Sequence, residues 1–218
     1  MIFMASTRLF PKDFLRHKQL KEKLNYLDDS VLRRLQRFPY RYRFAKSFRQ
    51  IEADTEIKTR TLIGYEAGMK VFLAYTCYEQ IVYVANNLKV DGVNSKAFNE
   101  VLNENIIICL HKNKTFMKLI TEAYESGLVE ETETKINKAK NNTTLSISLE
   151  KFINNKSSDI LCLAYAIRNL YAHGEFTGGG AGITNNKTRD LFYQIAEEIL
   201  NYSNSLYSQC ISKINLKR

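Results

Sequence analysis

The feature that most constrains the fold of this chain is a long stretch between Thr59 and Leu88 in which apolar residues recur at helical spacing. They stand three or four positions apart, at Met69, Leu73, Cys77, Ile81, Val84 and Leu88. This spacing puts them on one face of a single long α-helix. The chain also has only 2 prolines and 9 glycines among its 218 residues, which favours long helices over a turn-rich β fold. The sequence therefore predicts an all-α protein.

Shorter segments on both sides continue the helical pattern. Asp29 or Ser30 can cap a short helix over residues 31–37. We expect Pro39 to end that helix, because a proline disfavours the helical conformation of the residue before it. Residues 105–111 (NIIICLH) fit either a buried helix or a strand. Apolar spacing also predicts helices at residues 115–126, 158–172 and 187–213.

The net charge of the chain is concentrated near its N-terminus. Residues 8–49 contain thirteen Lys or Arg and four Asp or Glu, an excess of nine that equals the net charge of +9 for the whole chain. Such an asymmetry indicates a basic arm for a polyanionic partner. We therefore divide the chain into a basic N-terminal extension, residues 1–55, and a helical domain, residues 56–218.

Residues 33–49 (RRLQRFPYRYRFAKSFR) interleave basic and aromatic side chains. Basic side chains bind phosphates, and aromatic rings stack on unpaired bases. This pattern predicts an RNA-binding segment with the candidate residues Arg33, Arg34, Arg37, Tyr40, Arg41, Tyr42 and Arg43. In the alternative interpretation the aromatic rings pack on the domain and the charges only face solvent.

The sequence offers little for a metal, a cofactor or a membrane. The four cysteines are widely separated in apolar surroundings, which is typical of free, buried thiols in a reducing cytoplasm. The three histidines show no metal-ligand spacing. No apolar run reaches spanning length, and the start of the sequence lacks a signal-peptide core. We therefore expect a cytoplasmic protein with no metal, no cofactor and no membrane association.

The residues that most suggest chemistry follow an apolar run. Residues 160–167 (ILCLAYAI) carry no charge, and then come Arg168, Asn169 and, four positions later, His173. Burying such groups is costly unless they are paired or face water, so we expect them at a cleft. Arginine binds two phosphate oxygens at once, and histidine moves protons near neutral pH. These three residues are candidate catalytic residues for phosphate chemistry.

The pattern Arg-Asn-x-x-x-His, at the end of an apolar helix and ahead of a final long helix, resembles the signature of the HEPN superfamily. The resemblance implies a HEPN-like helical bundle and a metal-independent endoribonuclease that uses Arg168, Asn169 and His173. It also implies a homodimer that brings two copies of the motif to one cleft, and a 2′,3′-cyclic phosphate product. The implied setting is a toxin or anti-phage defence effector with an antitoxin or regulatory protein as partner.

One departure from the family bears on regulation. In HEPN toxins that are controlled by nucleotidylation, a tyrosine stands two residues after the histidine, where this chain has Glu175. We therefore do not expect that form of control here.

Two other interpretations stay open. The chain fits a non-catalytic HEPN-like module that binds RNA or another protein. It also fits a structural helical protein whose basic arm binds nucleic acid non-specifically. In that case Arg168 and His173 cap carbonyls or pair with a carboxylate such as Glu197 or Glu198.

Overall fold

The computed structural model describes residues 10–15, 18, 27–52, 56, 58–91, 104–125, 150, 152–154, 160–172 and 186–216. Within these ranges the chain forms helices and no strand, so the predicted all-α class is confirmed for the described part. The helices are α2 (Asp29–Ser47), α3 (Thr59–Asn87), α5 (Glu104–Lys112), α6 (Lys114–Glu125), α9 (Ile160–Ala172) and α10 (Asn186–Leu216).

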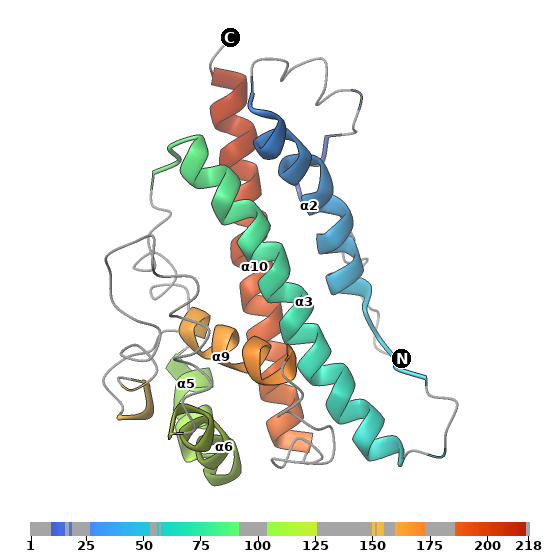
Figure 1. Ribbon diagram of the computed structural model, residues 1–218, viewed down its shortest axis with the longest axis vertical. Helices are drawn as coiled ribbons and strands as arrows, with labels where there is room; N and C mark the ends of the chain where they lie inside the picture. Colours follow the sequence, from blue (N-terminus) through green and yellow to red (C-terminus); the bar gives the residue numbers. More distant parts are fainter. Residues whose placement is uncertain are drawn as a thin grey trace.

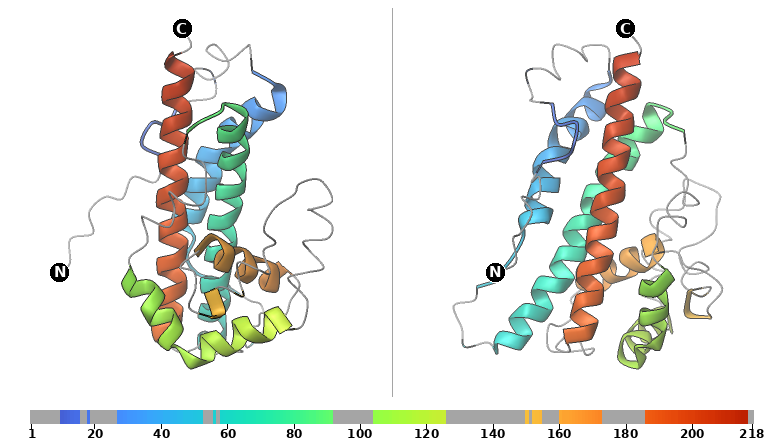
Figure 2. Two further views of the ribbon diagram at one scale, coloured as in Figure 1. Left: turned by 90° about the vertical axis from the view of Figure 1, so that its left-hand side faces the viewer. Right: turned by 180° about the vertical axis from the view of Figure 1, so that it is seen from behind.

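Three long helices form the body of the molecule. Helices α3 and α10 lie side by side and run in the same direction, while α2 packs along α3 in the opposite direction (Figure 1). Helix α9 lies across α3, and the short helices α5 and α6 lie near the first turns of α10 (Figure 2). Helix α9 therefore packs against the two longest helices, mainly α3 and to a lesser extent α10.

Helix α3 packs closely on its neighbours because it presents small residues to them. Gly64, Ala67, Gly68 and Ala74 are all buried. Small side chains let two helix axes approach each other, since the distance between packed helices depends on the residues at the contact. Of the apolar residues whose spacing predicted this helix, Cys77, Ile81, Val84 and Leu88 are buried, whereas Met69 and Leu73 are only partly buried.

Helix α2 corrects the expectation that Pro39 ends it. The helix runs on to Ser47 with Pro39 inside it, and its N-cap is Asp28, whose side chain accepts a hydrogen bond from the Ser30 amide at 2.8 Å. An internal proline costs about 3 kcal/mol or more. Burial of a full helical face offsets that cost, because the side chains on it are 0–4% exposed: Val31, Leu35, Phe38, Tyr42 and Ala45.

Helix α2 shares one hydrophobic core with the later helices. The Phe38 ring of α2 stacks on the Tyr207 ring of α10, with centroids 5.0 Å apart. Both rings are fully buried. Residues 29–47 are therefore a layer of the helical bundle, although they carry much of the basic charge.

The C-terminal helices follow the sequence pattern closely. Helix α10 begins one residue before the predicted 187–213 segment and extends three residues beyond it, and α9 ends at the predicted Ala172. The ambiguous residues 105–111 are helical, within α5. Cys77 and Cys210 are buried free thiols as expected, but Cys109 is exposed. On α5 its neighbour Leu110 takes the buried position, and adjacent residues point about 100° apart around a helix.

Among the described helices, none is long and apolar enough to cross a membrane.

Candidate functional site

The candidate catalytic residues lie at the end of the buried helix α9. From Ile160 to Leu170 nearly every described side chain of this helix is buried, and Arg168 is the partly exposed exception. Asn169 is only 1% exposed. His173 follows directly after the last residue of α9, and it lies outside the described residues.

The Arg168 side chain is held on two sides. Its Nη1 atom donates a hydrogen bond to Asn169 Oδ1 at 2.9 Å. Its Cζ atom lies 5.9 Å from the centre of the Phe72 ring and 6.0 Å from the centre of the Tyr165 ring. Both distances are within the range in which a cation is attracted to an aromatic face. Asn169 and the two rings therefore fix the direction of the guanidinium.

Two buried donors at this site lack an acceptor in the part of the chain that the structure describes. They are Arg168 Nε and Asn169 Nδ2. Leaving a buried donor unsatisfied costs about 1–3 kcal/mol. Unpaired donors on the guanidinium itself and on the neighbouring side-chain amide favour an oxygen-rich, negatively charged ligand, because such a ligand supplies several acceptors at once.

The charge of Arg168 acts on Glu79, a carboxylate of α3. Burial raises the pKa of Glu79 above its usual value, while the positive charges of Arg168, Arg34 and Arg41 act in the opposite direction. Within the described residues, however, Arg168 forms no ion pair. Its charge is therefore not neutralised by direct contact with a carboxylate of this part of the chain.

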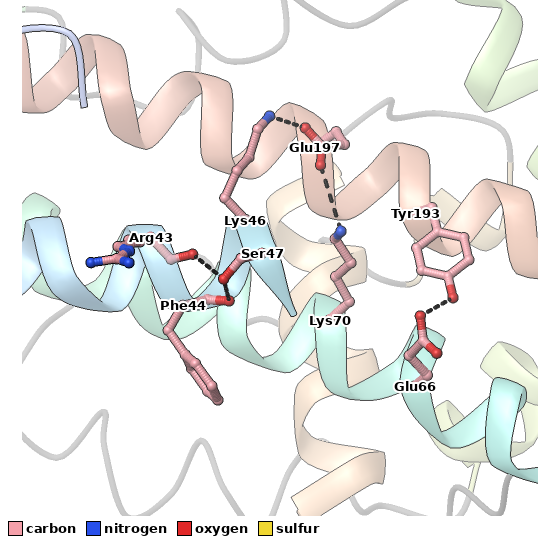
Figure 3. Close-up of polar contacts among 8 residues, drawn as sticks. All are labelled: Arg43, Phe44, Lys46, Ser47, Glu66, Lys70, Tyr193 and Glu197. Atoms are coloured by element: carbon pink, nitrogen blue, oxygen red, sulfur yellow. Dashed lines mark hydrogen bonds and ion pairs between the residues drawn. The ribbon is translucent and has the colours of Figure 1, made fainter. Parts of the chain in front are cut away.

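One interpretation of the sequence expected Glu197 to pair with Arg168, but no such ion pair is found within the described residues. Glu197 lies instead between two lysines of other helices, Lys46 of α2 and Lys70 of α3 (Figure 3). Lys46 donates a hydrogen bond to Glu197 Oε2, and Lys70 Nζ lies 3.8 Å from Glu197 Oε1. Burial lowers the pKa of Lys70, and the negative charge of Glu197 opposes that effect. This ion cluster joins the three long helices.

A second contact beside the ion cluster joins α3 to α10. Tyr193 donates a hydrogen bond to Glu66 Oε1 at 2.8 Å (Figure 3). The backbone N–H of Gln50 donates a hydrogen bond to the other carboxylate oxygen of Glu66, Oε2, at 3.0 Å. Gln50 has a positive φ of 67°, so this bond holds a strained residue of the connection between α2 and α3. The two hydrogen bonds are structural contacts between segments of the bundle.

Most candidate RNA-binding residues share an exposed stripe of α2. Arg33, Arg37, Tyr40 and Arg41 stand four, three and one positions apart along the helix and are all exposed, Tyr40 by 54%. Arg33 lies 3.7 Å from Asp29, and this exposed pair contributes little to stability. The stripe therefore presents three guanidinium groups and one ring to solvent.

The two remaining arginines of α2 rest on aromatic rings. The Arg34 guanidinium lies 4.2 Å from the centre of the Tyr83 ring of α3. The Arg43 guanidinium lies 5.0 Å from the centre of the Phe10 ring. Such contacts orient a guanidinium without neutralising its charge.

Tyr42 lies apart from the other candidates. It is only 4% exposed, its ring lies 5.9 Å from that of Phe38, and burial raises its pKa to about 12. Tyr42 is therefore a core residue that has no face open for stacking on a base. Helical geometry explains the difference, because Phe38 and Tyr42 are four apart and share the buried face of α2.

The sequence interpretation missed two rings beside Tyr40. Phe10 and Phe14 stack on each other with centroids 4.5 Å apart, and Tyr40 meets both edge-on, at 6.2 and 6.3 Å. No local pattern links residue 10 to residue 40, so only the fold could reveal this cluster. The aromatic part of the α2 surface is therefore made by two separate segments of the chain.

A basic groove of about 630 Å³ lies where α5 and α6 meet α10. Among the described residues, its walls carry Lys112, Lys114 and Lys187 and one carboxylate, that of Asp190. These lysines come from three helices, and no local pattern in the sequence predicts that they share a surface. The groove provides a second region where a polyanion can bind.

Among the described residues, no group of three or more His, Cys, Asp or Glu side chains is placed to hold a metal ion. No protein-family model matches this chain, and neither the curated proteins nor the solved structures searched contain a match.

Proposed function

We propose that this protein is a metal-independent endoribonuclease with a HEPN-like helical bundle, whose active site is formed by Arg168, Asn169 and His173. The observation that carries the proposal is the Arg168 guanidinium. It is bonded to Asn169 at the end of a buried helix, and it makes no ion pair within the described residues. Its own Nε and the adjacent Asn169 Nδ2 have no hydrogen-bond partner there either. His173, one residue beyond α9, supplies the imidazole that proton transfer requires.

The proposed reaction uses the 2′-hydroxyl of RNA as the nucleophile. The 2′-oxygen loses its proton and attacks the adjacent phosphorus, the bond from phosphorus to the 5′-oxygen breaks, and that oxygen takes up a proton. The products are a 2′,3′-cyclic phosphate and a 5′-hydroxyl. Arg168 stabilises the negative charge that develops on the phosphorane, and His173 transfers protons. Asn169 is buried and accepts a hydrogen bond from the guanidinium, so we assign it the positioning of Arg168.

The same site suits a dimer. One chain supplies one His173, whereas the reaction needs a group that accepts a proton and another that donates one. We propose a homodimer with two-fold symmetry in which both motifs face one cleft. We place the protein in the cytoplasm as a toxin or anti-phage defence effector, held in check by an antitoxin or another regulatory protein.

The oligomeric state gives the first prediction. Light scattering of the purified protein at micromolar concentration is expected to show a dimer. Arg168→Ala should leave that dimer intact, because the guanidinium is proposed to face the cleft. A monomer across the accessible concentration range would contradict the shared cleft.

The basic surface of α2 gives the second prediction. Replacing Arg33, Arg37 and Arg41 together by alanine should weaken RNA binding and flatten its dependence on salt. Each lost phosphate contact should lower the slope of log affinity against log salt by about 0.7 for single strands. Replacing Lys118, an exposed lysine of α6 that is paired with Glu122, is the control and should leave the slope unchanged. An unchanged slope in the triple variant would make the α2 stripe a merely solvated surface.

Incubation with RNA tests the proposed activity. Labelled tRNA and mRNA should be cleaved by the purified protein in buffer that contains EDTA, because no step uses a metal ion. The alternative is a non-catalytic module that binds RNA through α2, for which the exposed stripe of arginines is the supporting observation. Binding without cleavage under all conditions would favour that alternative.

A further inference from the structure

A row of aromatic rings leads up to Arg168. The Tyr65 ring of α3 meets the Tyr171 ring of α9 edge-on, with centroids 6.4 Å apart. The Tyr171 ring lies 6.1 Å from the Phe72 ring of α3. Phe72 in turn lies 5.9 Å from the Arg168 guanidinium. The order along the row is therefore Tyr65, Tyr171, Phe72 and then Arg168.

Helical geometry aligns these side chains. Tyr65 and Phe72 are seven positions apart, which is close to two full turns, so they share one side of α3. Arg168 and Tyr171 are three apart and share one side of α9. The Tyr171 hydroxyl also donates a hydrogen bond to the Tyr65 carbonyl at 3.3 Å, which ties the two helices together. The row is thus held by the crossing of α9 over α3.

The rings of the row are not core residues. Tyr65, Phe72 and Tyr171 are each partly exposed, whereas Tyr165, on the other side of Arg168, is buried. Partly exposed rings beside a cation suit single-stranded nucleic acids, whose bases stack on rings while their phosphates bind the charge. A base-paired duplex cannot bind in this way, because its bases are already stacked within the helix.

We propose that Tyr65, Tyr171 and Phe72 form a stacking row that holds unpaired bases of the RNA substrate while Arg168 holds the adjoining phosphate. The inference rests on the proposed function, and it adds that the substrate is single-stranded where it is cleaved. The row also makes Phe72 the residue that sets the position of the base next to the scissile phosphate. Among the three rings of the row, its ring is the one that lies 5.9 Å from the Arg168 guanidinium.

Tryptophan fluorescence offers a direct test, because the chain contains no tryptophan. Phe72→Trp puts a single fluorophore in the row, and stacking of a base on indole should quench its emission. Ile108→Trp, at an exposed position of α5, is the matched control. Both are made in a His173→Ala background so that the RNA stays intact, and each is titrated with a short oligouridylate and with an abasic oligomer of equal length and charge.

The expected result is quenching of Phe72→Trp by the oligouridylate, little change with the abasic oligomer, and no change for Ile108→Trp with either. In the same background, Phe72→Leu should lower the affinity for the oligouridylate by roughly 5- to 150-fold, the effect of losing one base on one ring. Its affinity for duplex RNA should change far less. If Phe72→Trp does not fold, Tyr65→Trp reports on the same row.

Several outcomes would overturn the stacking row. Equal responses to the two oligomers would show that charge alone is recognised. Emission that depends on protein concentration and not on RNA would show that a second copy of the chain covers the row. Cleavage of RNA by the wild-type protein, with no quenching of Phe72→Trp in the His173→Ala background, would refute the row and leave the ribonuclease standing. Quenching of Phe72→Trp, with no cleavage by the wild-type protein, would support the row and refute the ribonuclease.

Discussion

Replacing His173 by alanine is expected to reduce RNA cleavage by at least about 100-fold, the lower end of what a positioned acid or base contributes. RNA affinity and the free energy of unfolding should stay close to their wild-type values, because the imidazole is proposed to act on protons and not to bind the ground state. Arg168→Ala should lower both cleavage and affinity, since the guanidinium meets phosphate before and during the reaction. Single-turnover cleavage, RNA binding and urea unfolding check these three quantities.

The remaining residues at the end of α9 sharpen this prediction. Asn169→Ala should lower cleavage while preserving more activity than Arg168→Ala, because the amide acts through the guanidinium that it holds. Arg60→Ala, which removes an exposed arginine at the start of α3, is the control and should leave cleavage unchanged. Wild-type cleavage by His173→Ala, or a loss of several kcal/mol of stability in that variant, would make the histidine structural.

Replacing Glu197 by leucine is expected to destabilise the protein by roughly 3 kcal/mol, at the low end of the cost of breaking a buried ion pair. The loss arises because Lys46 and Lys70, with side chains only 15% and 8% exposed, would lose the carboxylate that pairs with them. The low end applies because the Glu197 side chain itself is 37% exposed. Urea unfolding measures the change, and RNA binding by the folded variant should be unaffected.

Two further variants separate the ion cluster from a general effect of charge. Glu198→Gln, at the next position of α10, should be neutral or slightly stabilising, because burial and then the charge of Glu197 both raise the pKa of Glu198. The double variant Glu197→Leu with Lys70→Met should recover part of the stability, since it removes an uncompensated buried charge. Equal losses from Glu197→Leu and Glu198→Gln would show that the cluster has no special role.

The helices could be predicted wherever the spacing of their own apolar residues was enough to identify a helix. The apolar residues of α3 and α10 recur at three and four positions over many turns, and no competing pattern interrupts them. Helix α2 was predicted too short, because Pro39 is a strong local signal for the end of a helix. The opposing signal, burial of Leu35 and Phe38 against other helices, depends on the fold. A local rule therefore gave way to tertiary packing.

The candidate site was predictable only in part. Arg168 and Asn169 stand out in sequence because polar groups end an apolar helix, but their mutual hydrogen bond gives Asn169 a role that spacing alone did not reveal. The aromatic row joins residues about a hundred positions apart, such as Phe72 and Tyr171. Such contacts leave no local trace in the sequence. The ion cluster around Glu197 was missed for the same reason.

The chemical ends of the RNA fragments test the central claim most directly. Fragments produced in EDTA should carry a 5′-hydroxyl that polynucleotide kinase labels without prior phosphatase treatment, and a 2′,3′-cyclic phosphate on the other side of the cut. These ends follow if the 2′-hydroxyl is the nucleophile and if Arg168 and His173 only stabilise charge and move protons. Fragments with a 5′-phosphate and a 3′-hydroxyl, or cleavage that EDTA abolishes, would contradict the account.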